Sequence, residues 1–162
     1  MSKTKIKKKT ELKFINHASV LISSGDVSLL SDPWYEGPAF NKGWSLVKEL
    51  SEEEVIRVIE DTTHIWLSHE HPDHFSIPFF KKYQDLMRER DIRVLFQSTR
   101  DQRVKNFLKM QKLEVQELDF GQWVELSPGF EVLCVKDGFY DSGLAVKTED
   151  MKLLNLNDCE IK

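Results

Sequence analysis

Residues 68–75 read Ser-His-Glu-His-Pro-Asp-His-Phe, and this stretch is the strongest indication of the fold. It contains three of the five histidines of the chain. It follows an apolar run at 65–67 that is typical of a short strand. Successive strand residues point to opposite sides, so His69 and His71 are predicted to share one side. Glu70 is then expected on the other side, at the surface or around the site.

Pro72 turns the chain and presents Asp73 and His74 from a turn or from the first residue of a helix. Imidazole and carboxylate groups together are ligands for Zn²⁺, Fe²⁺ or Mn²⁺. Four such groups exceed the three protein ligands of a mononuclear catalytic zinc, which leaves donors for a second ion. This density favours a metal site over a chance polar loop.

The N-terminal part predicts an antiparallel pair of strands. Apolar residues alternate with polar ones at 12–14 and 20–22, and 27–30 is apolar again. Residues 23–26 read Ser-Ser-Gly-Asp, a turn sequence between the two runs.

Helices and strands then alternate. Ser51 and Glu54 form a capping box that opens a helix with an apolar face at 55–59. Pro78 opens a second helix, whose aromatic and Met stripe is interpreted as core rather than as a cofactor-binding face. The other predicted elements are a strand at 93–96, a helix near 101–110, and strands near 115–118, 122–126, 130–136, 143–147 and 152–156.

The composition is that of one folded domain. The chain has 162 residues, of which 40% are hydrophobic and 31% charged. Four Trp and ten Phe need burial, which argues against disorder. No apolar run approaches the roughly 20 residues of a membrane span, and no signal peptide is visible. A cytoplasmic protein is therefore expected.

Charge is unevenly distributed. Residues 1–10 hold five Lys and no acid, so they are predicted to be a basic flexible leader. The remainder carries 18 basic and 27 acidic residues, a net charge of −9, which argues against a nucleic-acid partner. The two cysteines, Cys134 and Cys159, are too few for a disulfide framework or a Cys-based metal cassette.

Residues 32–44, DPWYEGPAFNKGW, form a loop that is rich in aromatic anchors. Two interpretations stay open. In one, Trp34, Phe40 and Trp44 cap the edge of the sheet. In the other, Asp32 lies near the metals and orients a ligand His by a hydrogen bond.

The stretch HEHPDH resembles the HxHxDH signature of the metallo-β-lactamase superfamily. Residues 14–19 and 29–34 are similar to the first strands of its lactonase and phospholipase-like branch. Three further stretches, 32–44, 68–78 and 153–159, resemble the metallo-β-lactamase-like part of CMP-N-acetylneuraminate hydroxylases. The resemblance covers roughly residues 14 to 159.

The resemblance implies a mixed α/β fold, a four-layer αββα sandwich, in a domain that spans residues 11–162. The chain stops four residues after Asp158. The second half, with a last His and its own sheet, is therefore expected to be missing or mostly missing, which leaves the N-terminal half to two thirds of the sandwich.

The resemblance also implies the roles of site residues. They are His69 and His71 as ligands of a first metal, Asp73 and His74 as ligands of a second, and Asp158 as the bridge between them. Asp73 and Asp158 are then the candidate catalytic residues. Without the resemblance, a lone Asp at a strand end reads as a turn former.

Two positions depart from the family pattern or add to it. The region 137–142 lacks the His that the family supplies there, and Asp141 is a candidate substitute that would favour Fe²⁺ or Mn²⁺. His17 lies where the family often has a His that faces the site, so it is a candidate donor or substrate contact. Asp32, Asp141 and His17 are thus expected around the ligands, whereas His64 is interpreted as structural.

Three functions remain in view. The first is a metal-dependent hydrolase with two divalent ions, zinc favoured over iron or manganese. Its metal-activated water would attack an ester, amide or phosphoester of a small molecule, with a nucleotide-sugar or phosphoester as candidate substrate.

The second function is an iron-dependent component that resembles the CMP-sugar hydroxylases but lacks their Rieske cluster, which needs paired Cys and His. A separate reductase would then supply electrons. The third is a truncated or split half-domain without activity of its own, completed by a homo-oligomer or by a separate C-terminal half.

Overall fold

The computed structural model describes residues 9–160, whose strands form two sheets. The strands of the first sheet are β1 (Glu11–Asn16), β2 (Ser19–Ser24), β3 (Val27–Ser31), β4 (His64–Leu67), β5 (Arg93–Gln97) and β6 (Glu114–Leu118). They lie in chain order across the sheet. The first three pair antiparallel, as predicted, and β3 to β6 pair in parallel.

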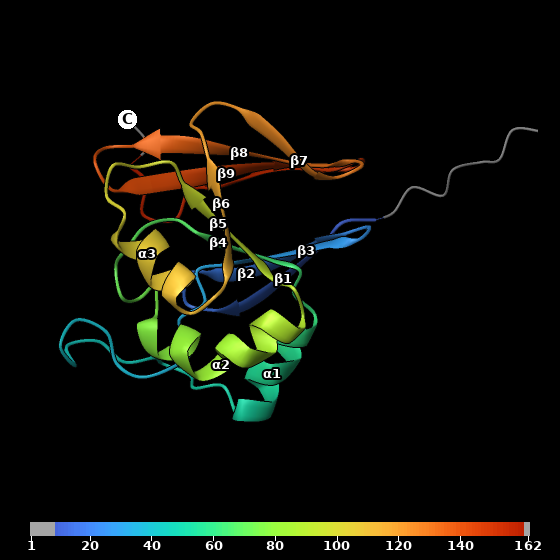
Figure 1. Ribbon diagram of the computed structural model, residues 1–162. Helices are drawn as coiled ribbons and strands as arrows, with labels where there is room; N and C mark the ends of the chain where they lie inside the picture. The colour runs from blue at the N-terminus through green and yellow to red at the C-terminus, as the bar shows by residue number, and fades with distance from the viewer. Residues whose placement is uncertain (1–8, 161–162) are drawn as a thin grey trace, which may run out of the picture.

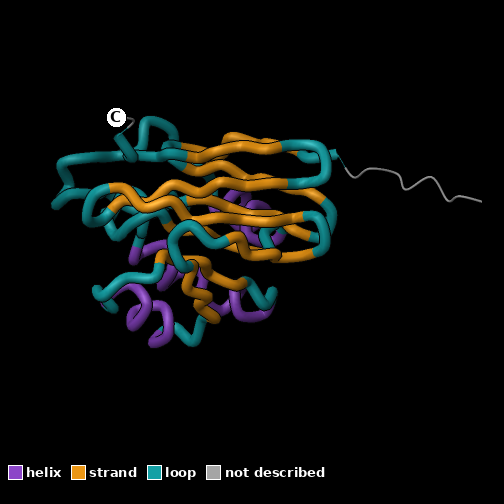
Figure 2. Tube along the Cα trace, turned by 90° about the horizontal axis from the view of Figure 1, so that it is seen from above, coloured by secondary structure: helices purple, strands orange, loops and turns teal. Residues whose placement is uncertain are grey.

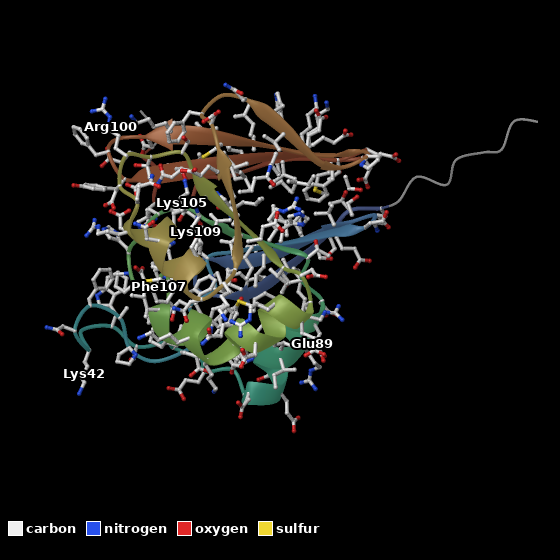
Figure 3. The ribbon with its side chains drawn as sticks, in the orientation of Figure 1. Lys42, Glu89, Arg100, Lys105, Phe107 and Lys109 are labelled. Atoms are coloured by element: carbon white, nitrogen blue, oxygen red, sulfur yellow. The ribbon has the colours of Figure 1, made fainter. Side chains whose placement is uncertain are left out.

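Three helices cover one face of this sheet (Figure 1). They are α1 (Glu52–Glu60), α2 (Ile77–Glu89) and α3 (Arg103–Met110), and each connects two neighbouring parallel strands. The buried Phe79, Phe80 and Met87 of α2 confirm that its aromatic stripe is core. The outer surface of this layer is charged, with Glu89 and Lys109 exposed (Figure 3). None of the described helices has the length and apolar character to cross a membrane.

The second sheet covers the opposite face of the first (Figures 1 and 2). It consists of β7 (Trp123–Ser127), β8 (Phe130–Asp137), β9 (Asp141–Lys147) and β10 (Lys152–Asn155), all antiparallel to their neighbours. Consecutive residues of the first sheet therefore face two different cores. Ile65 and Val94 pack against the helices, whereas Trp66 and Leu95 pack against the second sheet.

The capping box that opens α1 is present as predicted. Ser51 Oγ accepts a hydrogen bond from the Glu54 amide at 3.2 Å, and the Glu54 carboxylate accepts one from the Ser51 amide at 2.8 Å. The other predicted elements are also found, with bounds that differ by one to two residues at most ends. Local signals were sufficient here because capping and periodicity involve neighbouring residues.

One expectation was wrong. The second sheet was expected to be missing with the second half of the fold, but four of its strands lie within this chain. They are short and amphipathic, so the sequence pattern predicts the strands without showing to which sheet they belong. Within residues 9–160 there is no helix after α3, so the described layers are helices, sheet and sheet.

The predicted leader, residues 1–10, falls mostly on residues 1–8, which lie outside the described residues. Thr10 is buried. Its amide donates a hydrogen bond to Asp150 at 3.0 Å, and its hydroxyl lies 2.6 Å from that of Thr148. Thr10 therefore packs with the domain, next to the β9–β10 turn.

Candidate metal centre

The motif stretch 68–75 leaves the sheet at the carboxyl end of β4 and turns at once into α2. The turn closes on the carbonyl of His71, which accepts hydrogen bonds from the amides of His74 at 3.0 Å and Phe75 at 2.7 Å. Ser76 then caps α2, with its hydroxyl 3.3 Å from the Phe79 amide. The position of the motif is therefore fixed at both ends, by the sheet and by the helix cap.

The first donor group comprises His69, His71 and Asp158. The ring nitrogens His69 Nε2 and His71 Nδ1 lie 2.8 Å apart, and Asp158 Oδ2 lies 3.9 Å from His69 Nε2. His69 is buried, whereas His71 and the Asp158 side chain face solvent. The structure thus brings together residues from the motif and from the segment after β10.

The second donor group comprises His17, Asp73 and His74. Asp73 Oδ2 lies 3.1 Å from His17 Nε2 and 3.4 Å from His74 Nε2. Asp158 Oδ2 also lies 3.4 Å from His74 Nε2. Asp158 is therefore within reach of both groups, whose buried rings, His69 and His74, have centroids 4.2 Å apart.

The separations between donor atoms suit metal ions. Metal–ligand distances of about 2.0–2.2 Å place neighbouring ligand atoms roughly 2.8–3.6 Å apart in tetrahedral or octahedral geometry. Separations of 2.8, 3.1 and 3.4 Å fall in this range, and the 3.9 Å between Asp158 and His69 lies just beyond it.

Two buried atoms of the second group point to the same conclusion. Three buried side-chain atoms have no hydrogen-bond partner among the described residues: His74 Nε2 and Asp73 Oδ1 in this group, and Trp66 Nε1 in the core between the sheets. An unsatisfied buried polar atom costs about 1–3 kcal/mol, so such atoms usually serve a purpose. A cation between His74 Nε2 and Asp73 Oδ1 would satisfy both, and this donor set therefore fits a metal.

Asp32 contacts the second donor group through the Nδ1 atom of His74. Its side chain is fully buried, and Oδ2 accepts hydrogen bonds from His74 Nδ1 at 2.9 Å and Ser68 Oγ at 2.7 Å. Oδ1 accepts one from the Ser68 amide at 2.8 Å. With its Nδ1 held as a donor, His74 directs the lone pair of Nε2 toward Asp73 and Asp158. The hydrogen bond that the functional interpretation of Asp32 requires is present, and the orienting role itself stays a prediction.

The alternative interpretation, an aromatic plug, holds for one residue of the loop. Trp34 is buried, and its ring nitrogen donates to the Gly37 carbonyl at 2.8 Å. It is wrong for Phe40 and Trp44, which are 41% and 53% exposed. Their rings instead lie beside the centre, Phe40 at 5.9 Å from His71 and Trp44 at 6.4 Å from His17.

Asp141 lies at the start of β9, and its Oδ1 is 3.6 Å from His69 Nδ1. This is the nitrogen that faces away from His71 and Asp158, so Asp141 lies outside both donor groups. Sequence reasoning missed Ser68 and Asn157, which both donate to Asp32; Asn157 Nδ2 does so at 2.6 Å. These contacts join distant segments, and no local pattern marks them.

The electrostatics of the two buried rings differ. Burial lowers the pKa of His69, and the neighbouring His74 lowers it further. For His74, burial also lowers the pKa, but the hydrogen bond and the charge of Asp32 outweigh it and the pKa is raised. Metal binding requires both rings to be neutral, so protons compete for the site most strongly at His74.

His64 lies at the start of β4, with its Nδ1 2.8 Å from Thr63 Oγ1, and it belongs to neither donor group. Burial, together with the charge of Arg93, lowers its pKa below the usual 6.5. The folded state then binds fewer protons than the unfolded state. The stability that His64 contributes is therefore complete above pH 6.5 and is lost as pH falls from there toward the lower folded pKa.

We expect thermal unfolding in the presence of a chelator to show this effect. Between pH 7.5 and 5.5, the melting temperature of His64→Asn should decline less than that of the wild type. Equal declines in the two proteins would contradict this account of His64.

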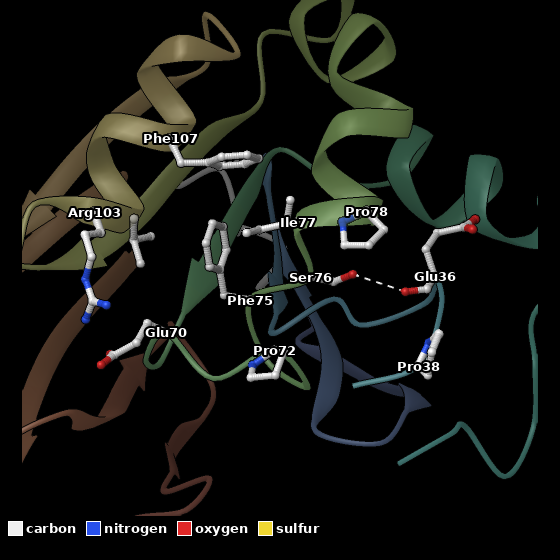
Figure 4. A pocket seen from close by; sticks show the side chains of 11 residues that line it. Glu36, Pro38, Glu70, Pro72, Phe75, Ser76, Ile77, Pro78, Arg103 and Phe107 are labelled. Atoms are coloured by element: carbon white, nitrogen blue, oxygen red, sulfur yellow. Dashed lines mark hydrogen bonds between the residues drawn. The ribbon is translucent and has the colours of Figure 1, made fainter. Parts of the chain in front are cut away.

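Glu70 lies on the other face of the motif, as expected. With Pro72 it lines a cavity of about 440 Å³ between the motif, α2 and α3 (Figure 4). The walls are mostly apolar and include Phe75 and Phe107, with Arg103 at one side. The six donor residues are not among its lining residues. The motif therefore separates this cavity from the metal centre.

The chain is similar to a known protein family and to several known proteins. A family model described as a beta-lactamase superfamily domain matches residues 11–132. The chain is 29% identical over 154 residues to a cytidine monophosphate-N-acetylneuraminic acid hydroxylase from Gorilla gorilla gorilla, covering 92% of this chain and 25% of the relative. It is equally similar to the inactive hydroxylase of Homo sapiens, of which it covers 30%. The chain thus spans about a quarter to a third of these relatives.

A similar solved structure is that of CmlA, a diiron beta-hydroxylase from Streptomyces venezuelae. It matches with a TM-score of 0.66 and 18% identity, over 94% of this chain and 30% of that one. At this identity the likeness shows the fold alone, whereas the family model gives the superfamily.

Proposed function

Since the chain belongs to the beta-lactamase superfamily, we propose that it is the metal-binding catalytic part of an enzyme that hydroxylates a small molecule. The single observation that carries this proposal is the pair of adjacent donor groups, His69–His71–Asp158 and His17–Asp73–His74. The identity to CMP-N-acetylneuraminic acid hydroxylases covers 92% of the chain.

Iron is the proposed metal rather than the zinc favoured by the motif alone. Imidazole suits zinc and iron alike, whereas carboxylates favour harder ions. Asp73 and Asp158 contribute one carboxylate to each of the two donor groups. Mixed His and carboxylate sets are those of known di-iron proteins.

Bound iron would supply the activation of O₂ that insertion of oxygen into a C–H bond requires. The overall reaction consumes the C–H bond, O₂, two electrons and two protons, and yields C–OH and water. The chain itself holds the ions, and Asp32 keeps the Nδ1 proton of His74 in place so that Nε2 faces the centre. Cys134 is buried and Cys159 is half-buried. A Rieske cluster needs two Cys and two His ligands, and these two cysteines do not form such a set. We therefore propose that electrons come from outside this chain.

The substrate we propose carries a flat or ring-shaped group, such as a nucleotide-sugar. Phe40 and Trp44 are exposed beside the two donor groups, with their ring centroids 5.1 Å apart. Stacking on aromatic side chains contributes about 1–3 kcal/mol per base. The loop that carries both rings projects from the domain, with Lys42 near its tip (Figure 3).

The experiment is a turnover assay of the iron-loaded chain with CMP-N-acetylneuraminic acid, O₂ and a chemical reductant. The expected result is a product heavier by one oxygen atom, formed only when all three are present. Hydrolysis is the second candidate function, because two metals can also activate water. Cleavage of a generic phosphodiester without O₂ or reductant, and no oxygenated product, would favour hydrolysis and overturn the hydroxylase proposal.

We also propose that another protein segment or a second copy covers the outer face of the second sheet. An apolar row crosses it through directly paired positions: Trp123, Leu133, Ala145 and Leu154. Trp123 and Leu154 are 49% and 54% exposed. Such a row on an open sheet is prone to association. We expect light scattering to show association that Leu154→Lys weakens. A monomer that is unchanged by this substitution would contradict a second copy as the cover.

The cytoplasmic location stays a prediction from the sequence.

A further inference from the structure

We infer that His17 is itself a ligand of the ion held by Asp73 and His74, and that it binds through Nε2. This inference rests on the proposed metal centre and names a donor outside the motif and its C-terminal carboxylate. His17 lies in the tight turn between β1 and β2, 56 residues before Asp73.

The backbone at His17 is in the left-handed region. Its φ is +46°, in the left-handed region that costs a non-glycine residue roughly 1–2 kcal/mol. Two-residue hairpin turns favour a positive φ, and the β1–β2 turn holds His17 in this conformation. Here the conformation directs the imidazole into the centre, toward Asp73.

The separations between atoms are those of a coordination shell. His17 Nε2 lies 3.1 Å from Asp73 Oδ2, which lies 3.4 Å from His74 Nε2, and the three donor atoms are all within 4.8 Å of one another. The group also contains the two buried atoms without hydrogen-bond partners, His74 Nε2 and Asp73 Oδ1. The separations from Asp73 Oδ2 to the two imidazole nitrogens are those of neighbouring ligands on one cation.

The ring of His17 is held in place by its neighbours. Trp34, which is buried, meets it edge to face at 5.0 Å and 89°, and the ring of His74 lies 5.8 Å away. The side chain remains 33% exposed. It is thus pre-positioned by packing and still open on one side, as a ligand next to a substrate entrance would be.

A ligand at this position has a structural consequence. Metal binding would tie the β1–β2 turn to the motif, so metal should slow amide exchange in that turn. A His17 that only donated a hydrogen bond to Asp73 would hold the turn equally in the presence and absence of metal. Hydrogen exchange therefore separates the two roles without any measurement of activity.

The test compares His17→Asn with His64→Asn, a matched loss of a histidine outside both groups. Asn tolerates the positive φ at position 17, so the turn should form. With iron, or with Co²⁺ as a spectroscopic probe, the wild type and His64→Asn are expected to bind about two ions per chain. His17→Asn should bind about one, its affinity for the other falling more than about 100-fold.

A rescue experiment adds a second readout. Glycine also fits the positive φ, and His17→Gly leaves room for free imidazole. Added imidazole should restore the second ion and the visible Co²⁺ spectrum in this variant, with no effect on the wild type. Two ions of unchanged affinity in His17→Asn, or equal protection of the turn with and without metal, would overturn the inference. A wild type that binds no metal would instead overturn the proposed function.

Discussion

Asp73→Asn is expected to remove one of the two ions and to lower turnover by at least about 100-fold. Asp73 Oδ2 is the atom that joins the second group, at 3.1 Å from His17 and 3.4 Å from His74. The amide keeps the size of the side chain but removes its charge, so the loss is electrostatic rather than steric. Elemental analysis and the turnover assay on the same sample measure both effects.

Glu70→Gln is the matched control for Asp73→Asn. It makes the same chemical change three positions earlier, on the face of the motif that lines the cavity. We expect it to keep both ions. An Asp73→Asn variant that retains two ions and normal turnover would show that Asp73 is not a ligand.

Asp32→Ala is expected to destabilise the metal-free fold by about 3–5 kcal/mol. Its buried carboxylate accepts hydrogen bonds from Ser68, His74 and Asn157, and the truncated side chain would leave these donors without a partner. The hydrogen bond and the charge of Asp32 also raise the pKa of His74. Urea unfolding at pH 7 with a chelator measures the free energy of unfolding without a contribution from metal.

Metal affinity should also fall in the Asp32 variant, by about 10- to 100-fold, because His74 loses the partner that orients it. Asp85→Ala is the control, since that side chain is 87% exposed and pairs with Arg88 at the surface. We expect its effect to stay within about 0.5 kcal/mol. If Asp32→Ala changed the free energy of unfolding as little as Asp85→Ala, the hydrogen bonds of Asp32 would not stabilise the fold.

Much of the fold could be predicted because its signals are local. The capping box at Ser51, the proline at the start of α2 and the alternation in β1 to β3 each involve residues a few positions apart. Which of the two sheets a strand joins is not decided by local signals. Trp66 and Phe130 belong to the same core between the two sheets, and the formation of this core depends on how the whole chain folds.

In the site, too, the residues that are close together in the sequence could be predicted, and the distant contacts could not. His69, His71, Asp73 and His74 lie within six residues and could be recognised from their spacing. Asp158 was identified by resemblance, because an isolated Asp carries no signal of its own. The contact between Asn157 and Asp32 spans 125 residues and could not be predicted.

The central claim is that one chain holds two metal ions in adjacent groups. The most direct measurement is elemental analysis of protein purified without added metal, with the molecular mass determined on the same sample. We expect about two ions per chain, mostly iron, in a discrete species. A folded, discrete species with no bound metal, and none taken up when iron is supplied, would contradict it.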